Sequence, residues 1–303
     1  MGHAHAPSAR RRRILLAIAS IIAMTGALLT FTTAPSGAAG PPPNTSIFFY
    51  AASMGGVTGT LHNGQFTQTA NVSVPGFTAA ALTRDTLLLY NENTGLAAIA
   101  TLKAGHLSAF KTVKNLGKYF ALAAGSCDSV LLYKSGSGAA LVLAVSGGAI
   151  THRKTYQLPK AFQYVDASCD TVSFYKAPPT GSMVGSIMLG TLKRGVYTHT
   201  TNLQYVSKYA SQGLVIAHST HSYLRYDPYA QTGQWGTSAA GQEKTVGAAN
   251  FSFFEYVAGT ADSLILYEWQ SGSAAFATLT GGDYTFVGSK TLSAGWQFIV
   301  GGK

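Results

Sequence analysis

The sequence has few charged residues, since Asp, Glu, Lys and Arg together make up only 11% of it. Beyond about the first forty residues it also lacks the apolar period of about 3.6 residues that marks amphipathic helices. Glycine, with 34 residues, and tyrosine, with 16, are abundant, and Ser, Thr and Ala are frequent too. This mixture is typical of short strands joined by tight turns, so we expect an all-β fold.

The sequence also lacks the motifs of several ligand classes. It contains no D-x-D-x-D-G loop of the calcium-binding type. Glycine pairs such as Gly147-Gly148 precede no helix, so they indicate hairpin turns and not phosphate-binding loops. His218 and His221 have H-x-x-H spacing without a third ligand nearby, whereas a zinc site usually has about four ligands. We therefore expect no metal and no cofactor.

Basic residues form no stripe interleaved with aromatic residues. The net charge is +10, but four basic residues form one run, Arg10–Arg13, and the others are scattered along the chain. Nucleic-acid binding is therefore not expected. Weak attraction to anionic wall polymers is compatible with this charge.

The N-terminal segment has the layout of an export signal. The run Arg10–Arg13 precedes an uncharged apolar stretch, Ile14–Leu29, and small residues and prolines follow. We assign residues 1–39 to a cleaved signal, 40–45 to a short Pro-rich linker, and expect a secreted protein. A twin-arginine signal is an alternative to the ordinary secretory route. Membrane attachment is expected only if the signal is retained.

The rest of the chain is an internal repeat. LLLY at 87–90 recurs as VLLY at 130–133 and LILY at 264–267, with looser copies elsewhere. The closing tyrosines are separated by 40, 43, 42, 51 and 41 residues and define six units: Tyr50, Tyr90, Tyr133, Tyr175, Tyr226 and Tyr267. Four units have an aspartate five residues before the tyrosine: Asp85, Asp128, Asp170 and Asp262. Six units of this length indicate a β-propeller.

Each unit is expected to form four antiparallel strands. In the third unit these are residues 129–135, 139–146, 149–157 and 162–169, joined by glycine-rich turns. The expected fold of residues 46–303 is therefore a six-bladed β-propeller with four-stranded antiparallel blades. A solenoid is the alternative, but it would have unprotected ends. The strand-like sequence GWQFIVGG at 295–302 is expected to join the N-terminal strands and close the ring.

The motifs DTLLLYNENTG (85–95), DSLILYEWQSG (262–272) and GWQFIVGG (295–302) together resemble the secreted tachylectin-like propellers common in actinobacteria. The resemblance covers nearly all of residues 44–303. It implies the propeller fold. Some members of this family are lectins and others are accessory domains, so no sugar-binding residue is transferred from them.

The repeated side chains are expected to be structural. An aspartate at a strand entry accepts backbone N–H bonds, and a tyrosine in every unit packs between blades with its hydroxyl capped by backbone. Cys127 and Cys169 occupy the same position in consecutive units. A disulfide between them requires both to lie at the lip of the channel, and the sequence leaves open whether they are bonded.

The candidate ligand-binding residues lie in the variable loops after the repeated tyrosines. A propeller places equivalent loops on one rim, and loops on a rigid scaffold commonly carry binding residues. Aromatic side chains beside acids and amides suit sugars, which stack on rings and hydrogen-bond through hydroxyls. The candidates are Asn91, Glu92, Asp227, Tyr229, Trp235, Glu268 and Trp269.

The expected function is carbohydrate binding without catalysis. The expected partner is a glycan or cell-surface polymer. The alternative is an extracellular protein-interaction scaffold. A polysaccharide-acting enzyme is a further alternative, because Asp227 and Glu268 share one position in adjacent units and a carboxylate pair can cleave glycosides. The sequence shows no nucleophile placed beside a base, so we expect no catalytic residue.

Overall fold

The computed structural model describes residues 45–74, 76–113, 116–179, 182–206 and 214–303. They all belong to one of the two compact units of the chain, Gly40–Lys303. The export signal expected over 1–39 and most of the linker expected over 40–45 lie outside the described residues. The segments that the structure describes include no apolar helix of membrane-spanning length.

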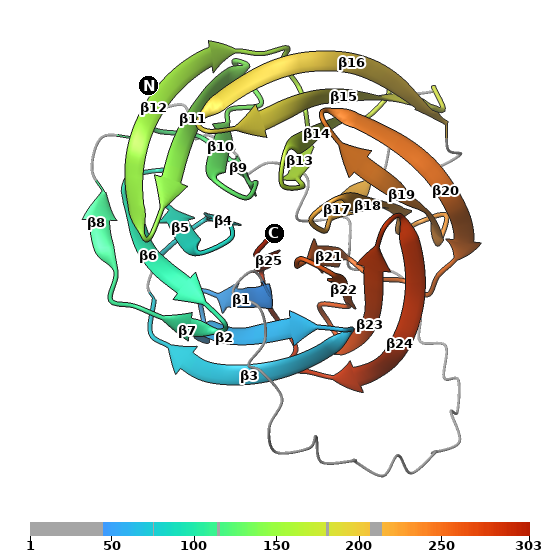
Figure 1. The fold of residues 1–303 in the computed structure, drawn as a ribbon, viewed down its shortest axis with the longest axis horizontal. Coiled ribbons are helices and arrows are strands. Elements are labelled where there is room, and N and C mark those ends of the chain that lie inside the picture. The colour runs from blue at the N-terminus through green and yellow to red at the C-terminus, as the bar shows by residue number, and fades with distance from the viewer. Residues whose placement is uncertain (1–44, 75, 114–115, 180–181, 207–213) are drawn as a thin grey trace, which may run out of the picture. The chain divides into compact units, whose positions relative to one another are not determined.

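The described residues form a ring of six antiparallel sheets, so the six-bladed β-propeller is confirmed (Figure 1). Blade 1 consists of β25 (Phe298–Gly301), β1 (Ser46–Ala51), β2 (Gly55–His62) and β3 (Gln65–Val72), from the axis outward. Blade 2 consists of β4 (Ala79–Leu82), β5 (Thr86–Tyr90), β6 (Ala97–Lys103), β7 (His106–Leu107) and β8 (Lys111–Val113). In this blade two short strands, β7 and β8, both pair with β6 and together form the outer edge.

The other four blades follow the chain in order. Blade 3 consists of β9 (Leu122–Gly125), β10 (Ser129–Tyr133), β11 (Ala139–Ser146) and β12 (Ala149–Gln157). Blade 4 consists of β13 (Tyr164–Ala167), β14 (Thr171–Lys176), β15 (Val184–Lys193) and β16 (Val196–Val206). Blade 5 consists of β17 (Val215–His218), β18 (Ser222–Asp227), β19 (Thr232–Ala239) and β20 (Gln242–Asn250). Blade 6 consists of β21 (Tyr256–Gly259), β22 (Ser263–Tyr267), β23 (Ser273–Thr280) and β24 (Asp283–Thr291).

The ring closes through its C-terminal strand, as the sequence predicted. Strand β25 pairs antiparallel with β1, with Ile47 opposite Gly301 and Tyr50 opposite Phe298. Blade 1 therefore combines the last strand of the described chain with its first three strands. Because β25 and β1 pair with each other, the backbone groups on their facing edges are hydrogen-bonded and not left open.

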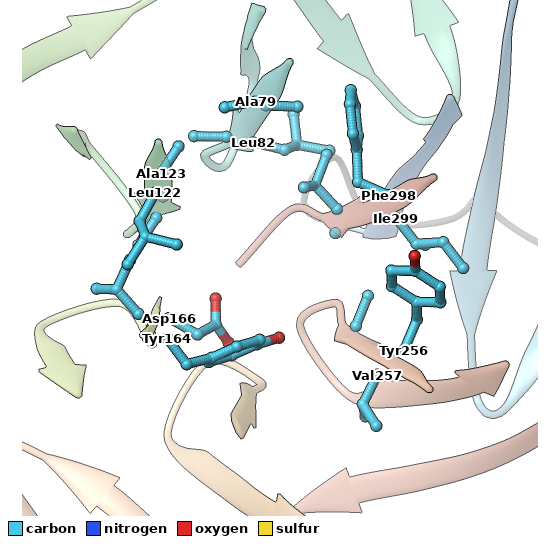
Figure 2. A pocket seen from close by; sticks show the side chains of 18 of the residues that line it. Ala79, Leu82, Leu122, Ala123, Tyr164, Asp166, Tyr256, Val257, Phe298 and Ile299 are labelled. Carbon is cyan, nitrogen blue, oxygen red and sulfur yellow. The ribbon is translucent and has the colours of Figure 1, made fainter. Parts of the chain in front are cut away.

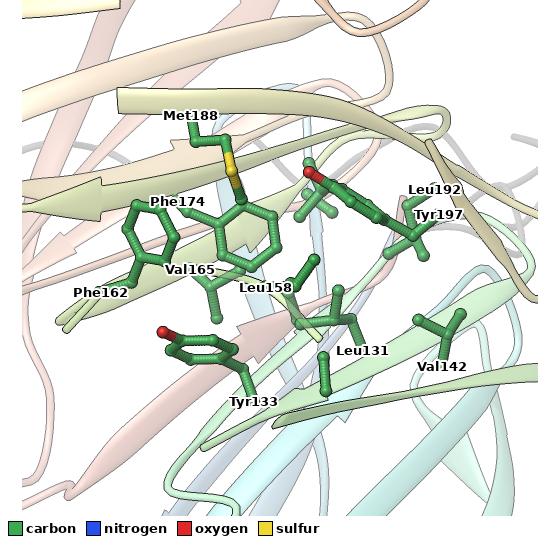
Figure 3. Close-up of a cluster of buried hydrophobic side chains, with 14 residues drawn as sticks. Leu131, Tyr133, Val142, Leu158, Phe162, Val165, Phe174, Met188, Leu192 and Tyr197 are labelled. Carbon is green, nitrogen blue, oxygen red and sulfur yellow. The ribbon is translucent and has the colours of Figure 1, made fainter. Parts of the chain in front are cut away.

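Apolar side chains fill the six interfaces between neighbouring blades. All residues of the second strands β5, β10 and β22 are buried, because both faces of these strands pack against other side chains. One interface joins blades 3 and 4, where Leu131 and Tyr133 pack with Phe174, Met188 and Tyr197 (Figure 3). The outer strands are largely exposed and polar, since one of their faces meets solvent.

A hydrogen bond repeated at every interface also links the blades. A Ser or Thr hydroxyl at the start of each second strand accepts the N–H of a hairpin glycine in the next blade, over 2.8–3.0 Å. Each of these glycines has a positive φ, which strongly favours glycine there. The pairs form a closed cycle: Ser46–Gly105, Thr86–Gly148, Ser129–Gly195, Thr171–Gly241, Ser222–Gly282 and Ser263–Gly64.

The repeated aspartates support this cycle. Asp128 accepts the Ser129 hydroxyl at 2.7 Å and the Arg194 N–H of the next blade at 2.8 Å. Asp262 accepts the Ser263 hydroxyl at 2.7 Å and the N–H of Asn63 at 3.1 Å. The prediction of a structural role is confirmed for these two. Their backbone donors, however, come from the neighbouring blade and not from a local turn.

The repeated tyrosines are buried, and the predicted backbone capping of their hydroxyls is confirmed in four units. Each of these hydroxyls donates to a backbone carbonyl 26 or 27 residues further along the chain, over 2.6–2.8 Å. The carbonyls lie in the connections that lead to the next blade, so the tyrosines fix these connections. The pairs are Tyr90–Gly117, Tyr133–Pro159, Tyr226–Ser252 and Tyr267–Ser293.

Candidate functional site

The two faces of the ring carry different loops. One face, here called the rim, holds the loops between the second and third strand of every blade, such as those joining β18 to β19 and β22 to β23. The opposite face holds the turns between the first and second strands and the outer hairpins. Of the predicted ligand-binding residues, Trp235 lies within strand β19, and the others lie in rim loops or, for Asp227, at the strand end that enters one.

Three of these residues hold the shape of their own loops. The fully buried Asp227 accepts the N–H groups of Tyr229 at 3.0 Å and Ala230 at 2.9 Å through Oδ1. Asn91 accepts two N–H groups within its loop in the same way. Glu268 accepts the hydroxyl of Ser271 at 2.6 Å. The position directly after the repeated tyrosine therefore stabilises the rim loop in three blades.

The remaining predicted residues differ in how far they are exposed. Trp235 packs between blades against Phe251 and Tyr284. Glu92 is partly buried, and its N–H donates to Thr78 Oγ1 at 2.9 Å. Tyr229 and Trp269 reach solvent, with exposed fractions of 46% and 42%. These two aromatic side chains, in adjacent blades, are the parts of the predicted set that are best placed to contact a ligand on the rim.

Other large apolar side chains are exposed on the same face. Met54, Leu96 and Met183 lie in rim loops of blades 1, 2 and 4, each more than two-fifths exposed. Within the described residues, the turns of the opposite face have no exposed large apolar side chain. The loops of the rim therefore expose more large apolar side chains than the turns of the opposite face, and further ones lie on the outer strands.

A channel pocket of about 240 Å³ runs along the axis of the ring (Figure 2). Strands β4, β9, β13, β21 and β25 line it, largely with small apolar residues such as Ala79 and Ala123. Tyr164 and Tyr256 lie at its rim end, because they pair with Tyr175 and Tyr267, which directly precede rim loops. Figure 2 shows the side chains of Tyr164 and Asp166 directed into the channel.

Lys303 lies at the end of the channel opposite the rim. Its ammonium group donates to the backbone oxygens of His218 and, at 2.9 Å, Gly259, and it lies 3.7 Å from Asp166 Oδ2. Only 2% of Lys303 is exposed. The Lys303 side chain therefore links the inner strands β17 and β21 and narrows this end of the channel.

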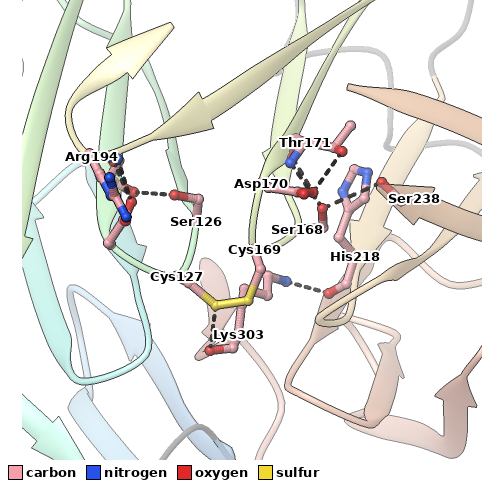
Figure 4. Close-up of a disulfide and its surroundings, with 12 residues drawn as sticks. Ser126, Cys127, Ser168, Cys169, Asp170, Thr171, Arg194, His218, Ser238 and Lys303 are labelled. Atoms are coloured by element: carbon pink, nitrogen blue, oxygen red, sulfur yellow. Dashed lines mark hydrogen bonds between the residues drawn. A yellow bond between two sulfur atoms is a disulfide. The ribbon is translucent and has the colours of Figure 1, made fainter. Parts of the chain in front are cut away.

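A disulfide joins Cys127 and Cys169 beside Lys303 (Figure 4). The cysteines lie in the turns after β9 and β13, and their Cα atoms are 4.3 Å apart. Cys127 Sγ is 3.3 Å from the backbone oxygen of Lys303. The bond links two neighbouring blades at the lip of the channel, on the face opposite the rim.

A buried ionic cluster surrounds this end of the channel. His218 Nδ1 lies 3.2 Å from Asp166 Oδ2, and His218 Nε2 lies 3.0 Å from Glu243 Oε1. Arg225 pairs with the other oxygen of Glu243, and Ser173 donates to Glu243 Oε1 at 2.5 Å. The side chains of His218 and Glu243 are fully buried. Charges this deep need such partners to offset the loss of hydration.

The cluster keeps its members charged. Burial alone would lower the pKa of His218, but hydrogen bonds to Asp166 and Glu243 raise it above its usual value. Burial would raise the pKa of both carboxyls, but their cationic neighbours hold it below the usual range. Burial lowers the pKa of Lys303, and Asp166 partly offsets this shift. Both ring nitrogens of His218 face carboxylate oxygens, an arrangement that favours the protonated imidazolium form.

The repeat did not predict this cluster, although the sequence holds a signal for it. Arg225 interrupts the copy YLRY, where the corresponding residue in the other five copies is apolar. Asp166 stands in YVDA, where the equivalent inner strands read AAAL, LAAG and YVAG. Polar residues at positions that are apolar in the other units could have indicated a buried polar group.

Comparisons with known proteins support the fold and nothing finer. No protein-family model matches the chain, and no curated protein sequence matches it significantly. The chain is similar to a structure in a nidogen/laminin complex, with 10% identity, a TM-score of 0.53, and coverage of 84% of this chain and 97% of that one. It is also similar to a functionally unknown protein from Desulfotomaculum acetoxidans DSM 771, with 8% identity, a TM-score of 0.51, and coverage of 82% and 81%.

A further likeness is to the β-propeller domain of Cps50 (Swd1) from Myceliophteria thermophila. It has 10% identity, a TM-score of 0.44 and coverage of 74% of both chains. Identities this low concern the fold alone. The ring of six antiparallel sheets itself defines the class as a six-bladed β-propeller, and a propeller scaffold suits a binding or scaffolding role.

Proposed function

We propose that this chain is a secreted, tachylectin-like propeller that binds a carbohydrate on its rim without catalysing a reaction. The observation that carries the proposal is the exposure of Trp269 and Tyr229 in adjacent rim loops. An aromatic ring gives the apolar face of a sugar a flat surface, and the contact loses little side-chain entropy because few torsions are fixed.

The loops that carry these rings are well ordered by local contacts. The N–H of Trp269 donates to Glu255 Oε2 at 2.7 Å, and the N–H of Tyr229 donates to the buried Asp227. Fixed backbones reduce the entropy lost on binding. The partly exposed carboxylate of Glu268, next to Trp269, supplies a hydrogen-bond acceptor for sugar hydroxyls.

A protein-interaction scaffold is the second candidate, and a specific observation favours it. Met54, Leu96 and Met183 extend the exposed apolar surface to three further blades of the same face. Methionine adapts its shape to a partner, and exposed apolar patches commonly mark protein interfaces. This surface would bind a protein through the rim, in place of a glycan.

Replacing Trp269 or Tyr229 with alanine tests the proposed rim site. We expect each change to weaken glycan binding about tenfold or more, because each removes an aromatic contact surface. The matched control is Phe286→Ala, since Phe286 is 58% exposed but lies in the outer strand β24. A glycan array selects the ligand, and isothermal titration calorimetry gives its affinity for each variant.

If both rim variants bind the glycan with unchanged affinity, the proposed rim site is rejected. If the unaltered protein binds no glycan on the array but copurifies with a specific protein, the scaffold function replaces the lectin function. In that case the Met54→Ala and Met183→Ala variants should lose the protein partner.

A further inference from the structure

The channel pocket and the rim share one opening. The pocket begins at Tyr164 and Tyr256, at the level of the rim loops, and Lys303 and the disulfide lie at its other end. Its volume of about 240 Å³ lies just below the ~300–1,000 Å³ of sites for drug-sized ligands. The pocket therefore has room for one small ring, and a longer molecule would have to extend out over the rim.

The charges in the pocket exclude ionic ligands. Lys303 and the protonated His218 already neutralise Asp166, so a ligand ammonium would add a third cation next to two buried ones. A ligand anion would lie near the carboxylate of Asp166, and two of the three N–H groups of Lys303 already donate to backbone oxygens while the ammonium group pairs with Asp166. A neutral ligand avoids both costs.

Two polar atoms of the pocket remain open to a ligand. The contacts that Asp166 makes with His218 and Lys303 go to Oδ2, and the carboxylate also interacts with the N–H of Ala167. A carboxylate has about four acceptor positions, so Oδ1 retains the capacity to accept a hydrogen bond from a ligand. The hydroxyl of Tyr164 has no hydrogen-bond partner among the described residues. Burial and the nearby Asp166 raise the pKa of Tyr164, so its hydroxyl keeps its proton. The pocket thus offers one strong acceptor and one phenol donor beside aromatic rings.

We propose that the channel binds a single neutral sugar ring, with ligand hydroxyls donating to Asp166 Oδ1 and the Tyr164 hydroxyl donating to a ligand oxygen. The apolar face of the ring packs on Tyr164 and on the alanine-rich wall. The pocket thereby becomes a second subsite, which holds the terminal residue of a glycan whose next residues lie on the rim. This inference rests on the proposed carbohydrate function for the identity of the longer ligand, but its preference for neutral hydroxyls comes from the pocket alone.

Two substitutions test the channel without disturbing the ionic cluster. Tyr164→Phe removes the hydroxyl and keeps the ring. Ala121→Trp places a large side chain at the mouth, where Ala121 is exposed and lines the pocket. The control is Ala249→Trp, because Ala249 is also exposed but lies on the outer strand β20. Thermal unfolding of each variant checks that the fold is retained.

The probes are neutral monosaccharides, their methyl glycosides, glucosamine and glucuronate, titrated by calorimetry into the full chain. We expect a neutral monosaccharide to bind, and both charged sugars to bind at least tenfold more weakly. Tyr164→Phe and Ala121→Trp should each weaken the binding of the neutral sugar about tenfold or more. Ala249→Trp should change the affinity for the neutral sugar less than about threefold.

The outcomes separate the channel from the rim. Suppose that Trp269→Ala weakens the affinity for a glycan, but Tyr164→Phe and Ala121→Trp change the affinity for neither the glycan nor the monosaccharide. The channel subsite is then rejected and the rim site stands. If charged sugars bind as tightly as neutral ones, the assignment of the ligand class is rejected. If the unaltered protein binds neither monosaccharide nor glycan, both proposals are rejected.

Discussion

Deleting residues 295–303 should lower the midpoint of thermal unfolding by at least about 10 °C. The deletion removes the whole of β25 and with it Trp296 and Ile299, which are buried in the interface between blades 6 and 1. Losing one large core side chain typically costs about 2–5 kcal/mol. Several such losses approach the total stability of a domain, about 5–15 kcal/mol.

The deletion also opens the ring. Without β25, the backbone groups of β1 on its inner side lose their partners and form an exposed strand edge. Differential scanning calorimetry of the shortened chain measures the decrease in the midpoint of thermal unfolding. A synthetic peptide of residues 295–303 should reverse part of this decrease by adding back the strand. If melting is unchanged in the shortened chain, the pairing of β25 with β1 does not hold the ring together.

Glu243→Ala should destabilise the protein by about 3–5 kcal/mol, since it leaves two buried cations without their shared carboxylate. His218 and Arg225 both contact Glu243, and its side chain is fully inaccessible to solvent. The control is Asp283→Ala, because Asp283 is exposed at the start of β24 and should cost less than about 0.5 kcal/mol. Chemical denaturation of both variants gives the two values. Equal stability of the two variants would contradict the buried cluster.

The same cluster predicts how stability depends on pH. The pKa of His218 is higher in the folded protein than its unfolded value of about 6.5. Its contribution is therefore complete below about pH 6.5 and is lost as the pH rises through the raised folded value. The lowered pKa values of Asp166 and Glu243 act in the opposite sense, so their contribution is complete above about pH 4.5 and is lost in acid.

We therefore expect the cluster to stabilise the fold most between about pH 4.5 and 6.5. Above that window the free energy of unfolding should fall, and His218→Gln should remove most of this slope. His221→Gln is the matched control, because His221 is exposed. Denaturation curves from pH 5 to 9 measure the slope. The same slope in both variants would contradict a protonated, buried His218.

The repeat determined how much of the fold could be predicted. An apolar run ending in tyrosine marks each second strand, and a glycine at a fixed distance marks each turn, so six copies define six blades. The closing strand could be predicted because the first unit starts without an inner strand while residues 295–302 supply one. The cycle of hydroxyl–glycine bonds was not predicted, although Ser129 and Gly195 are both visible in the repeat, because the bond crosses from one blade to the next.

The site was harder to predict for the same reason. Asp166 and His218 are 52 residues apart, and Ser173 and Glu243 are 70 apart, so their contacts exist only once the ring has formed. Sequence variation in the rim loops drew attention to that face. It could not distinguish Asp227, which shapes its loop, from Trp269, which reaches solvent.

A crystal structure of the full chain soaked in a mixture of neutral mono- and oligosaccharides tests the proposed binding face most directly. We expect density for a sugar ring in the channel against Asp166 and Tyr164, and for further residues against Trp269 or Tyr229 on the rim. Sugar bound only to the outer strands or to the face of the disulfide, with the rim and channel empty, would contradict it.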